Sequence, residues 1–139
     1  MKNITIHPVF AALYKYAQRD VIYLRSRHSF TVGEWVAVSA TSSQNVAITA
    51  DETNEIPFFK KTLDSIRTAT PINYESLSGN CVAVVRISNL NPVNDPFTIG
   101  IDKIIPLASM VPVPPKYRNS FPMELPAEIV VAILKQARQ

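Results

Sequence analysis

The 139-residue sequence has very few of the residues on which disulfides, metal sites and glycine-rich loops depend. Its single cysteine, Cys81, can neither close an internal disulfide nor assemble a zinc site, and we expect it to be a small buried side chain. Three scattered glycines, Gly33, Gly79 and Gly100, cannot build a loop that cradles a phosphate. The sequence therefore argues against nucleoside-triphosphate chemistry and predicts neither a metal nor another cofactor.

Long apolar runs are missing as well. No stretch approaches the roughly 20 apolar residues that a membrane helix requires, and the first residues lack the apolar run of a secretory signal. We therefore expect a cytoplasmic protein without a membrane partner. A hydrophobic content of 47% over 139 residues suits one well-filled core, which predicts a single domain spanning residues 1–139.

The charge balance is mildly basic. A formal net charge of +3 and a pI near 9.1 weakly favour an anionic partner. Many of the cations fall into two groups along the sequence, namely Arg19, Arg25, Arg27 and His28, and then Lys60, Lys61 and Arg67. Each group acts as a nucleic-acid patch only if the fold brings it onto one surface, and is otherwise an ordinary solvated face.

Hydrophobic spacing predicts three helices. The first begins at Pro8, where the missing amide donor costs nothing, and the second runs from about Pro57 to Arg67. The third begins at Pro126, with Glu128 near its positive end. The predicted buried stripe of the first helix is Phe10, Leu13, Tyr14 and Ala17, and that of the last is Leu125, Ile129, Ala132 and Ile133.

Runs of β-branched and aromatic residues predict short strands around these helices. The predicted strands are Ile4–Ile6, Val21–Arg25, Trp35–Ala40, Val46–Thr49, Cys81–Ser88 and at least one within Phe97–Leu107. Close spacing of strands predicts an α+β fold, a small mixed β-barrel of about five to six strands flanked by two to three helices. The proline-rich segment Val111–Pro115 is expected to be extended and to wrap the barrel, with a polyproline ligand as the alternative.

Four segments in this order resemble the ASCH branch of the PUA-like superfamily. An apolar residue and a proline lead into a helix at Ile6–Leu13, and Val21–Arg27 is similar to the strand following the family's GxKxxExR motif. A glycine-acid turn then enters a strand at Val32–Ser42, and Gly79–Ile87 resembles the family's apolar strand. The resemblance covers about half of the chain and implies a PUA-like barrel with a cleft that accepts RNA or a nucleobase.

The sequence departs from this family where relatives carry catalytic groups. Some ASCH proteins hydrolyse acetylated cytidine with a lysine, a threonine and a glutamate, and the lysine and threonine positions fall here on Asp20 and Val21. A carboxylate and an isopropyl group cannot supply the same nucleophilic chemistry. The resemblance therefore implies the fold and the binding cleft, and it argues against that enzymatic activity.

A nucleic-acid-binding module needs rings for stacking, polar groups for base edges and cations for phosphates. The candidates are Tyr23 and Trp35 for stacking, Ser39, Thr41 and Ser42 for hydrogen bonds, and Arg25, Arg27, His28, Lys60 and Lys61 for phosphate. We expect the Tyr23–Arg25 edge and the end of the tryptophan strand to form the walls of one cation-lined slot. Trp35 could instead be a core residue, and Arg25 could instead clamp a carboxylate such as Glu34.

Two other functions stay open. A hydrolase acting on RNA or a modified nucleoside could use His28 and Lys60, although His7 is most simply a helix-entry residue and His28 a solvated one. A protein-interaction effector could instead use the segment Val111–Tyr117 and the C-terminal helix. The sequence leaves open the choice between RNA and DNA, the identity of the base and the presence of a protein partner.

Overall fold

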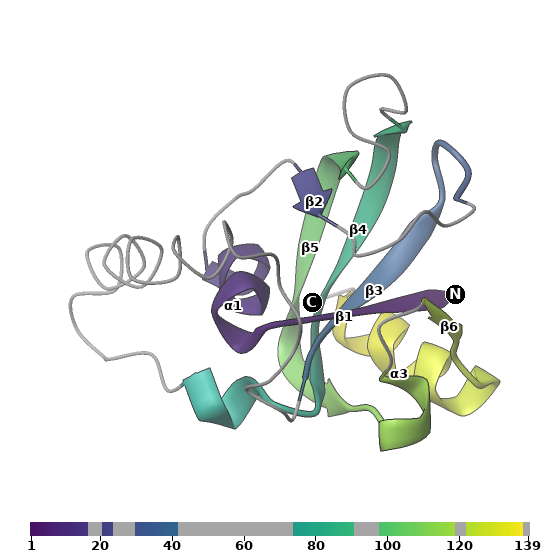
Figure 1. The fold of residues 1–139 in the computed structure, drawn as a ribbon. Coiled ribbons are helices and arrows are strands. Elements are labelled where there is room, and N and C mark those ends of the chain that lie inside the picture. The colour runs from purple at the N-terminus through teal and green to yellow at the C-terminus, as the bar shows by residue number, and fades with distance from the viewer. Residues whose placement is uncertain (17–20, 24–29, 42–73, 91–97, 119–121, 138–139) are drawn as a thin grey trace.

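The computed structural model describes residues 1–16, 21–23, 30–41, 74–90, 98–118 and 122–137. These residues form one mixed sheet with strand order β2-β5-β4-β3-β1-β6 and a helix against each of its faces (Figure 1). The strands are β1 (Lys2–Ile6), β2 (Val21–Tyr23), β3 (Trp35–Ala40), β4 (Asn80–Leu90), β5 (Thr98–Pro112) and β6 (Met123–Glu124). The helices are α1 (Pro8–Tyr16) and α3 (Ala127–Ala137), and the 3₁₀ turns are η1 (Tyr74–Leu77) and η2 (Pro115–Tyr117).

The predicted α+β class is confirmed, but the prediction of a closed barrel is wrong. Strands β2 and β6 lie at the two edges of the sheet, and no pairing among the described strands joins them. Closely spaced strands suggested closure, yet a sheet closes only when its first and last strands meet. Here the two apolar faces are covered by helices instead, so the sheet stays open.

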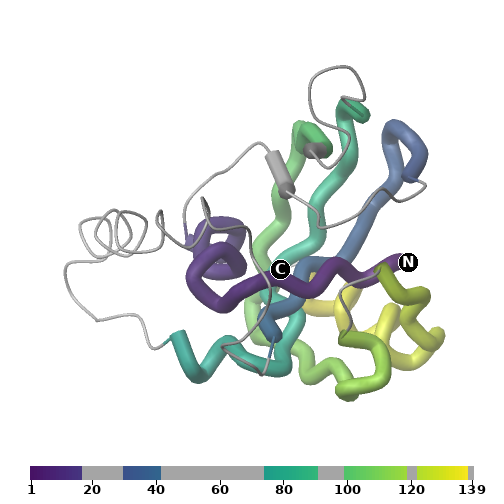
Figure 2. The backbone as a smooth tube through the Cα atoms, viewed as in Figure 1, coloured from purple at the N-terminus to yellow at the C-terminus, as the bar shows by residue number. Residues whose placement is uncertain are grey.

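The chain direction explains why the sheet is mixed. Strand β1 runs parallel to β3, whereas the other pairs are antiparallel. A parallel pair needs a crossover, and α1 follows β1 directly on the route to β3. Figure 2 traces this route and shows the N-terminus beside the segment that contains β6.

Helix α1 covers one face of the sheet and carries the larger core. It begins at Pro8 as predicted, and every residue from Pro8 to Tyr14 is buried. The prediction that His7 is a helix-entry residue is confirmed, because its Nδ1 accepts a hydrogen bond from the amide of Val9 at 3.2 Å. The strand residues on this face include Val36, Val38 and Ala40, which alternate along β3. In β4 they include Val82, Val85 and Ile87, and the register shift after Cys81 interrupts the alternation there.

Helix α3 covers the opposite face and packs on β5 and β4. Its neighbours on the sheet form a second buried cluster that includes Ala37, Cys81, Val84 and Val111. Of the stripe predicted for this helix, Leu125 and Ile133 are buried, while Ile129 and Ala132 are half-buried. Strand β4 is therefore buried on both faces, as its continuous apolar run predicted.

Strand β5 is longer than predicted and includes the first part of the proline-rich segment. Beyond Gly100, β4 is the only described strand that pairs with β5, so the other side of β5 is an edge where proline is tolerated. The pairing register shifts between Pro106 and Val111, and this bulge also makes the edge a poor template for another strand. Pro112 ends the strand, and η2 follows at Pro115.

Two glycines occupy turns that require a positive φ. Gly33 has φ 89° in the tight turn before β3, where the amide of Glu34 donates to the carbonyl of Thr31 at 3.0 Å. Gly79 has φ 80° and joins two strand ends, because its amide donates to Ala40 and its carbonyl accepts from Val113. The predicted helix at 57–67 and strand at 46–49 lie outside the described residues.

No helix in the described part of the chain is long and apolar enough to cross a membrane.

Candidate nucleic-acid interface

The structure describes some of the predicted site residues. The side chains of Trp35, Ser39 and Thr41 and the backbone of Tyr23 lie within the described residues. The other six candidates, Arg25, Arg27, His28, Ser42, Lys60 and Lys61, lie outside them. Those six stay predictions.

Tyr23 and the end of the tryptophan strand do not form the two walls of one slot. Tyr23 pairs with Thr98, the first residue of β5, whereas Ser39 pairs with Cys81, which in turn pairs with Val111 near the far end of β5. Two strands, β5 and β4, separate β2 from β3, and the two residues lie toward opposite ends of the sheet. Strand order and register, which the sequence does not reveal, decide this separation.

Ser39 is an interior residue rather than a reader of base edges. Its side chain is fully buried, and its Oγ donates a 2.6 Å hydrogen bond to Oδ1 of Asn3. Asn3 is also fully buried, and its Nδ2 donates to the carbonyl of Tyr117 at 3.0 Å and contacts Oγ1 of Thr5 at 3.3 Å. The serine thus satisfies an asparagine that ties β1 to the segment after β5.

Cys81 adjoins this buried polar group, in keeping with the expectation of a small interior side chain. Its thiol contacts the carbonyl of Ala83 at 3.5 Å. Burial raises the pKa of Cys81 to about 12, and hydrogen bonds from the surroundings, including Ser39, offset only part of that effect. A thiol in this state is a poor nucleophile at neutral pH.

Thr41 is also buried, with a relative exposure of 7%. It follows the last residue of β3, and its amide donates to the carbonyl of Ile6 at 2.9 Å. The neighbouring carbonyl of Ala40 accepts from the amide of Gly79. Thr41 therefore belongs to the junction of three chain segments and offers little surface to a ligand.

Trp35 is the one predicted stacking residue whose side chain the structure describes. The indole is half-buried and packs against the core beneath α3, so part of it serves as a core residue. The guanidinium carbon of Arg86 lies 6.0 Å from the centre of its ring system, within the range of a cation–π contact. The tryptophan is thus both a core residue and one layer of a surface stack.

Arg86 is held over Trp35 by a carboxylate on the next strand. Its Nε and Nη2 donate to Oδ1 and Oδ2 of Asp102 at 2.9 and 2.5 Å, which is the bidentate arrangement that fixes the plane of a guanidinium. The hydrogen bonds from Arg86 lower the pKa of Asp102, and those to Asp102 raise the pKa of Arg86. Both groups are therefore charged at neutral pH.

Lys103 extends this pair across the sheet. In the observed register Trp35 pairs with Arg86, and Arg86 pairs with Lys103, so the three residues form one row across β3, β4 and β5. Lys103 is exposed, and the side chains of Arg86 and Asp102 have relative solvent exposures of 31% and 40%. We call Trp35, Arg86 and Lys103 the cross-strand row.

Sequence reasoning missed Arg86 and Lys103 as site residues. One signal was present, because Arg86 is the only charged residue within the apolar run Cys81–Ser88. Its partner Lys103 lies in a strand whose register was not predictable. The row becomes visible only when the pairing of the three strands is known.

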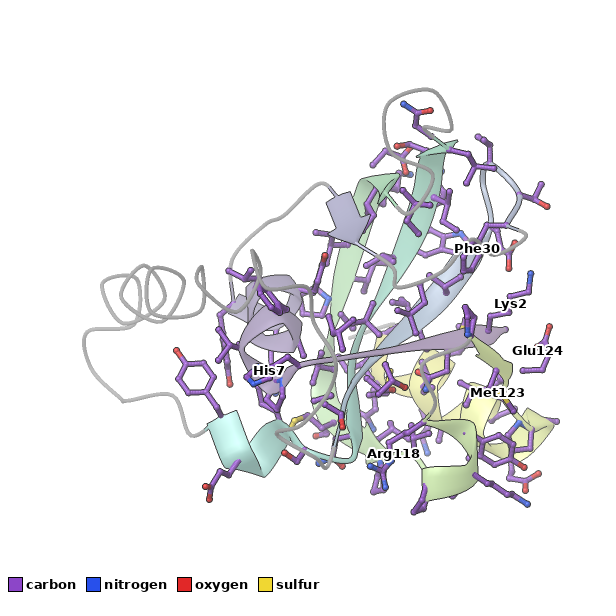
Figure 3. The ribbon with its side chains drawn as sticks, in the orientation of Figure 1. Lys2, His7, Phe30, Arg118, Met123 and Glu124 are labelled. Carbon is purple, nitrogen blue, oxygen red and sulfur yellow. The ribbon has the colours of Figure 1, made fainter. Side chains whose placement is uncertain are left out.

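A second charged pair lies near the starts of β1 and β3, where Figure 3 labels Lys2 and Phe30. Nζ of Lys2 lies 3.4 Å from Oε2 of Glu34 and 5.2 Å from the centre of the Phe30 ring. The other oxygen of Glu34 accepts from the amide of Thr31 at 3.0 Å. The observed partners of Glu34 are thus Lys2 and a backbone amide, and the alternative pairing with Arg25 involves a residue outside the described ranges.

Metal chemistry has no site in the part of the chain that can be described. Within those ranges no group of three or more His, Cys, Asp or Glu side chains is placed to hold an ion. The neighbouring hydroxyl of Ser39 and thiol of Cys81 are fully buried, so solvent does not reach them.

Neither a protein-family model nor a curated protein matches the sequence. The resemblance to ASCH domains therefore stays a prediction.

Proposed function

We propose that this protein is a nucleic-acid-binding module that holds single-stranded RNA or a modified nucleobase, and that the cross-strand row is part of its binding surface. The observation that carries the proposal is the stack of Arg86 on Trp35, fixed by Asp102 and flanked by exposed Lys103. An ASCH-type relationship is a second support. The proposal keeps the cytoplasmic location expected from the sequence.

The chemistry of the row suits a single-stranded ligand. Unpaired bases stack on aromatic rings and on the planes of arginine side chains, and such stacking tolerates many base identities. Because Asp102 holds the guanidinium, a base that stacks there loses little free energy to ordering the side chain. Lys103 supplies a positive charge that is not used in any ion pair among the described residues, which suits a phosphate.

The sequence provides a direct probe, because Trp35 is its only tryptophan. We would titrate the protein with single-stranded RNA and DNA of the same sequence at low and high salt, following tryptophan emission and fluorescence anisotropy of labelled strands. Stacking on the row should quench Trp35, and added salt should weaken binding because phosphate contacts release counterions. Modified and unmodified nucleosides, added as competitors, would separate a nucleobase site from a strand site.

Three substitutions locate the site. Arg86→Ala should weaken binding about tenfold, in line with the loss of one stacked base. Lys103→Ala should lower the magnitude of the slope of the logarithm of the binding constant against the logarithm of salt concentration by about 1, which corresponds to the loss of one phosphate contact. Lys15→Ala is the matched control, since Lys15 lies on α1 at the opposite face of the sheet. If neither RNA nor DNA binds at low salt, the proposed function is wrong. If strands bind but Arg86→Ala and Lys103→Ala leave the affinity unchanged, the cross-strand row is not the binding site.

No observation on the described residues favours the hydrolase alternative. Ser39 and Cys81 are the adjacent nucleophile-type side chains, but both are buried and burial raises the pKa of the thiol to about 12. The alternative of a protein-interaction surface is supported by the exposed apolar side chains of Val131 and Leu134 on α3.

A further inference from the structure

Helix α3 is a mostly apolar helix with an outer surface that the sheet does not cover. Among its eleven residues only Ile133 is fully buried, while Val131 is 64% and Leu134 is 38% exposed. The described residues contain one other exposed large hydrophobic side chain, Val32, in the turn before β3. A helix that is apolar on most sides normally has a partner on more than one of them.

The exposed residues of α3 gather on one side of the helix. Ala127, Val131 and Leu134 are exposed and spaced at i, i+4 and i+7, so they form an apolar stripe along the outer face. We call these three residues the outer stripe. At 100° per residue, buried Ile133 points to the opposite side, toward the sheet.

Two opposite charges flank the same side of this stripe. Glu128 and Lys135 are exposed and lie seven residues apart, about 10 Å along the helix axis. The helical repeat places both on one flank of Val131, whereas Ala127 and Leu134 lie on the other flank. Within the described ranges neither Glu128 nor Lys135 takes part in an ion pair.

We propose that the outer stripe binds the outer stripe of a second copy of this chain, with the two α3 helices antiparallel about a two-fold axis. The axis passes between Val131 and Ala132. Glu128 of each copy then lies level with Lys135 of the other, and Leu134 of each lies within about 3 Å, along the helix axis, of the level of Ala127 of the other.

The symmetry selects this arrangement over the parallel one. An antiparallel two-fold pair brings like flanks together with the helix direction reversed, so a flank with an acid at one end and a base at the other complements itself. A parallel two-fold pair brings unlike flanks together and would set Glu128 and Lys135 against the apolar flank of the partner copy. The charge pattern is therefore an argument for one occupant and one geometry.

The expected dimer is weak. One face of a three-turn helix buries less surface than a stable protein–protein interface requires, so assembly should depend on protein concentration within an accessible range. The association needs only the exposed side of α3, and none of its residues belongs to the cross-strand row.

Sedimentation equilibrium from about 10 μM to about 1 mM tests the proposal with a charge exchange. Glu128→Lys and Lys135→Glu should each weaken self-association at least about tenfold, because each creates like-charge contacts twice in the dimer. The double variant E128K/K135E should associate again, and so should an equimolar mixture of the two single variants. Leu134→Glu should abolish association, whereas Lys15→Glu on α1 should leave it unchanged.

The exchange separates interface effects from folding effects. Both charge substitutions oppose the helix dipole, so the double variant is expected to be the least stable fold, and its recovery of dimerisation cannot come from stability. A wild-type chain that stays monomeric at about 1 mM would overturn the proposal and leave the stripe to another protein. If the wild-type chain and the two single charge variants dimerise equally well, the antiparallel pairing of α3 is wrong.

Discussion

The two faces of the sheet are covered to different degrees. On one face α1 buries every residue from Pro8 to Tyr14. On the other, α3 buries only Ile133 completely and leaves Val131 exposed. The half-buried Trp35 and the Arg86–Asp102 pair belong to this second, less covered side. The candidate binding surfaces therefore lie where the sheet is only partly covered.

The largest expected difference between the faces is the effect of removing an apolar side chain. Phe10→Ala should lower the free energy of unfolding by about 3–5 kcal/mol, because Phe10 is buried and its removal leaves a cavity. Val131→Ala should change it by less than about 0.5 kcal/mol. Urea denaturation of both variants checks this, and equal losses would show that the two faces are equally packed.

A pH-dependent effect should come from Cys81 on the α3 face. Its pKa is raised from 9.0 to about 12 in the folded state, so between these values the unfolded state has lost the proton that the folded state keeps. Stability from this residue is therefore full below pH 9.0 and falls as pH rises toward 12. From pH 9 to pH 11 the loss should be on the order of 2 kcal/mol.

The control for this effect is Cys81→Ala, which has no thiol to titrate. Urea unfolding at pH 9 and pH 11 should show a steeper decline for the wild-type chain than for the variant. The thiol should also resist alkylation in the folded protein at pH 8 and react after unfolding. Parallel declines of the two proteins would contradict the burial of an ionisable thiol.

A moderate effect is expected at the entry of α1. His7→Ala should cost about 1 kcal/mol, because the amide of Val9 loses the acceptor that Nδ1 provides. His7→Asn should retain most of the stability, since asparagine is a favoured residue at the start of a helix. Thermal denaturation of the two variants measures the difference, and a loss of the same size in both would mean that packing against Phe10 matters more than the cap.

The smallest expected effect concerns the exposed pair of Arg86 and Asp102. The hydrogen bonds from Arg86 lower the pKa of Asp102 below 3.8, so its contribution to stability is present above that value and lost as pH falls through the folded pKa. NMR titration of the carboxyl carbon should show this lowered pKa in the wild-type chain. Arg86→Ala should return it toward 3.8, and an unchanged value would mean that the pair does not persist in solution.

Local patterns predicted the elements that depend on neighbouring residues. The proline at position 8 followed by residues at helical spacing predicted α1, and the apolar run after Gly79 predicted β4 and its burial on both faces. These predictions are confirmed because side-chain periodicity and turn chemistry act over a few residues. The predicted strand within Phe97–Leu107 was shorter than β5, because proline usually interrupts a strand. Prolines are tolerated in β5 because one side of the strand is an edge.

The candidate site depended on contacts between distant segments. A serine in an apolar strand could face a ligand or the interior, and the face of β3 that carries Ser39 turned out to oppose buried Asn3. The row of Trp35, Arg86 and Lys103 likewise required the pairing of three strands. The open sheet was missed for the same reason, because local spacing does not specify which strands become edges.

The sequence by itself determined a mildly basic α+β chain, the start of its first helix and its central buried strand, since these follow from composition and from interactions between near neighbours. Only the tertiary structure decided that Ser39 is enclosed, that Arg86 lies on Trp35 and that one face of α3 is left uncovered. The physical reason is that register and layer packing join residues far apart in the chain, and a hydrophobic pattern constrains which face a residue takes but not which partner it meets there.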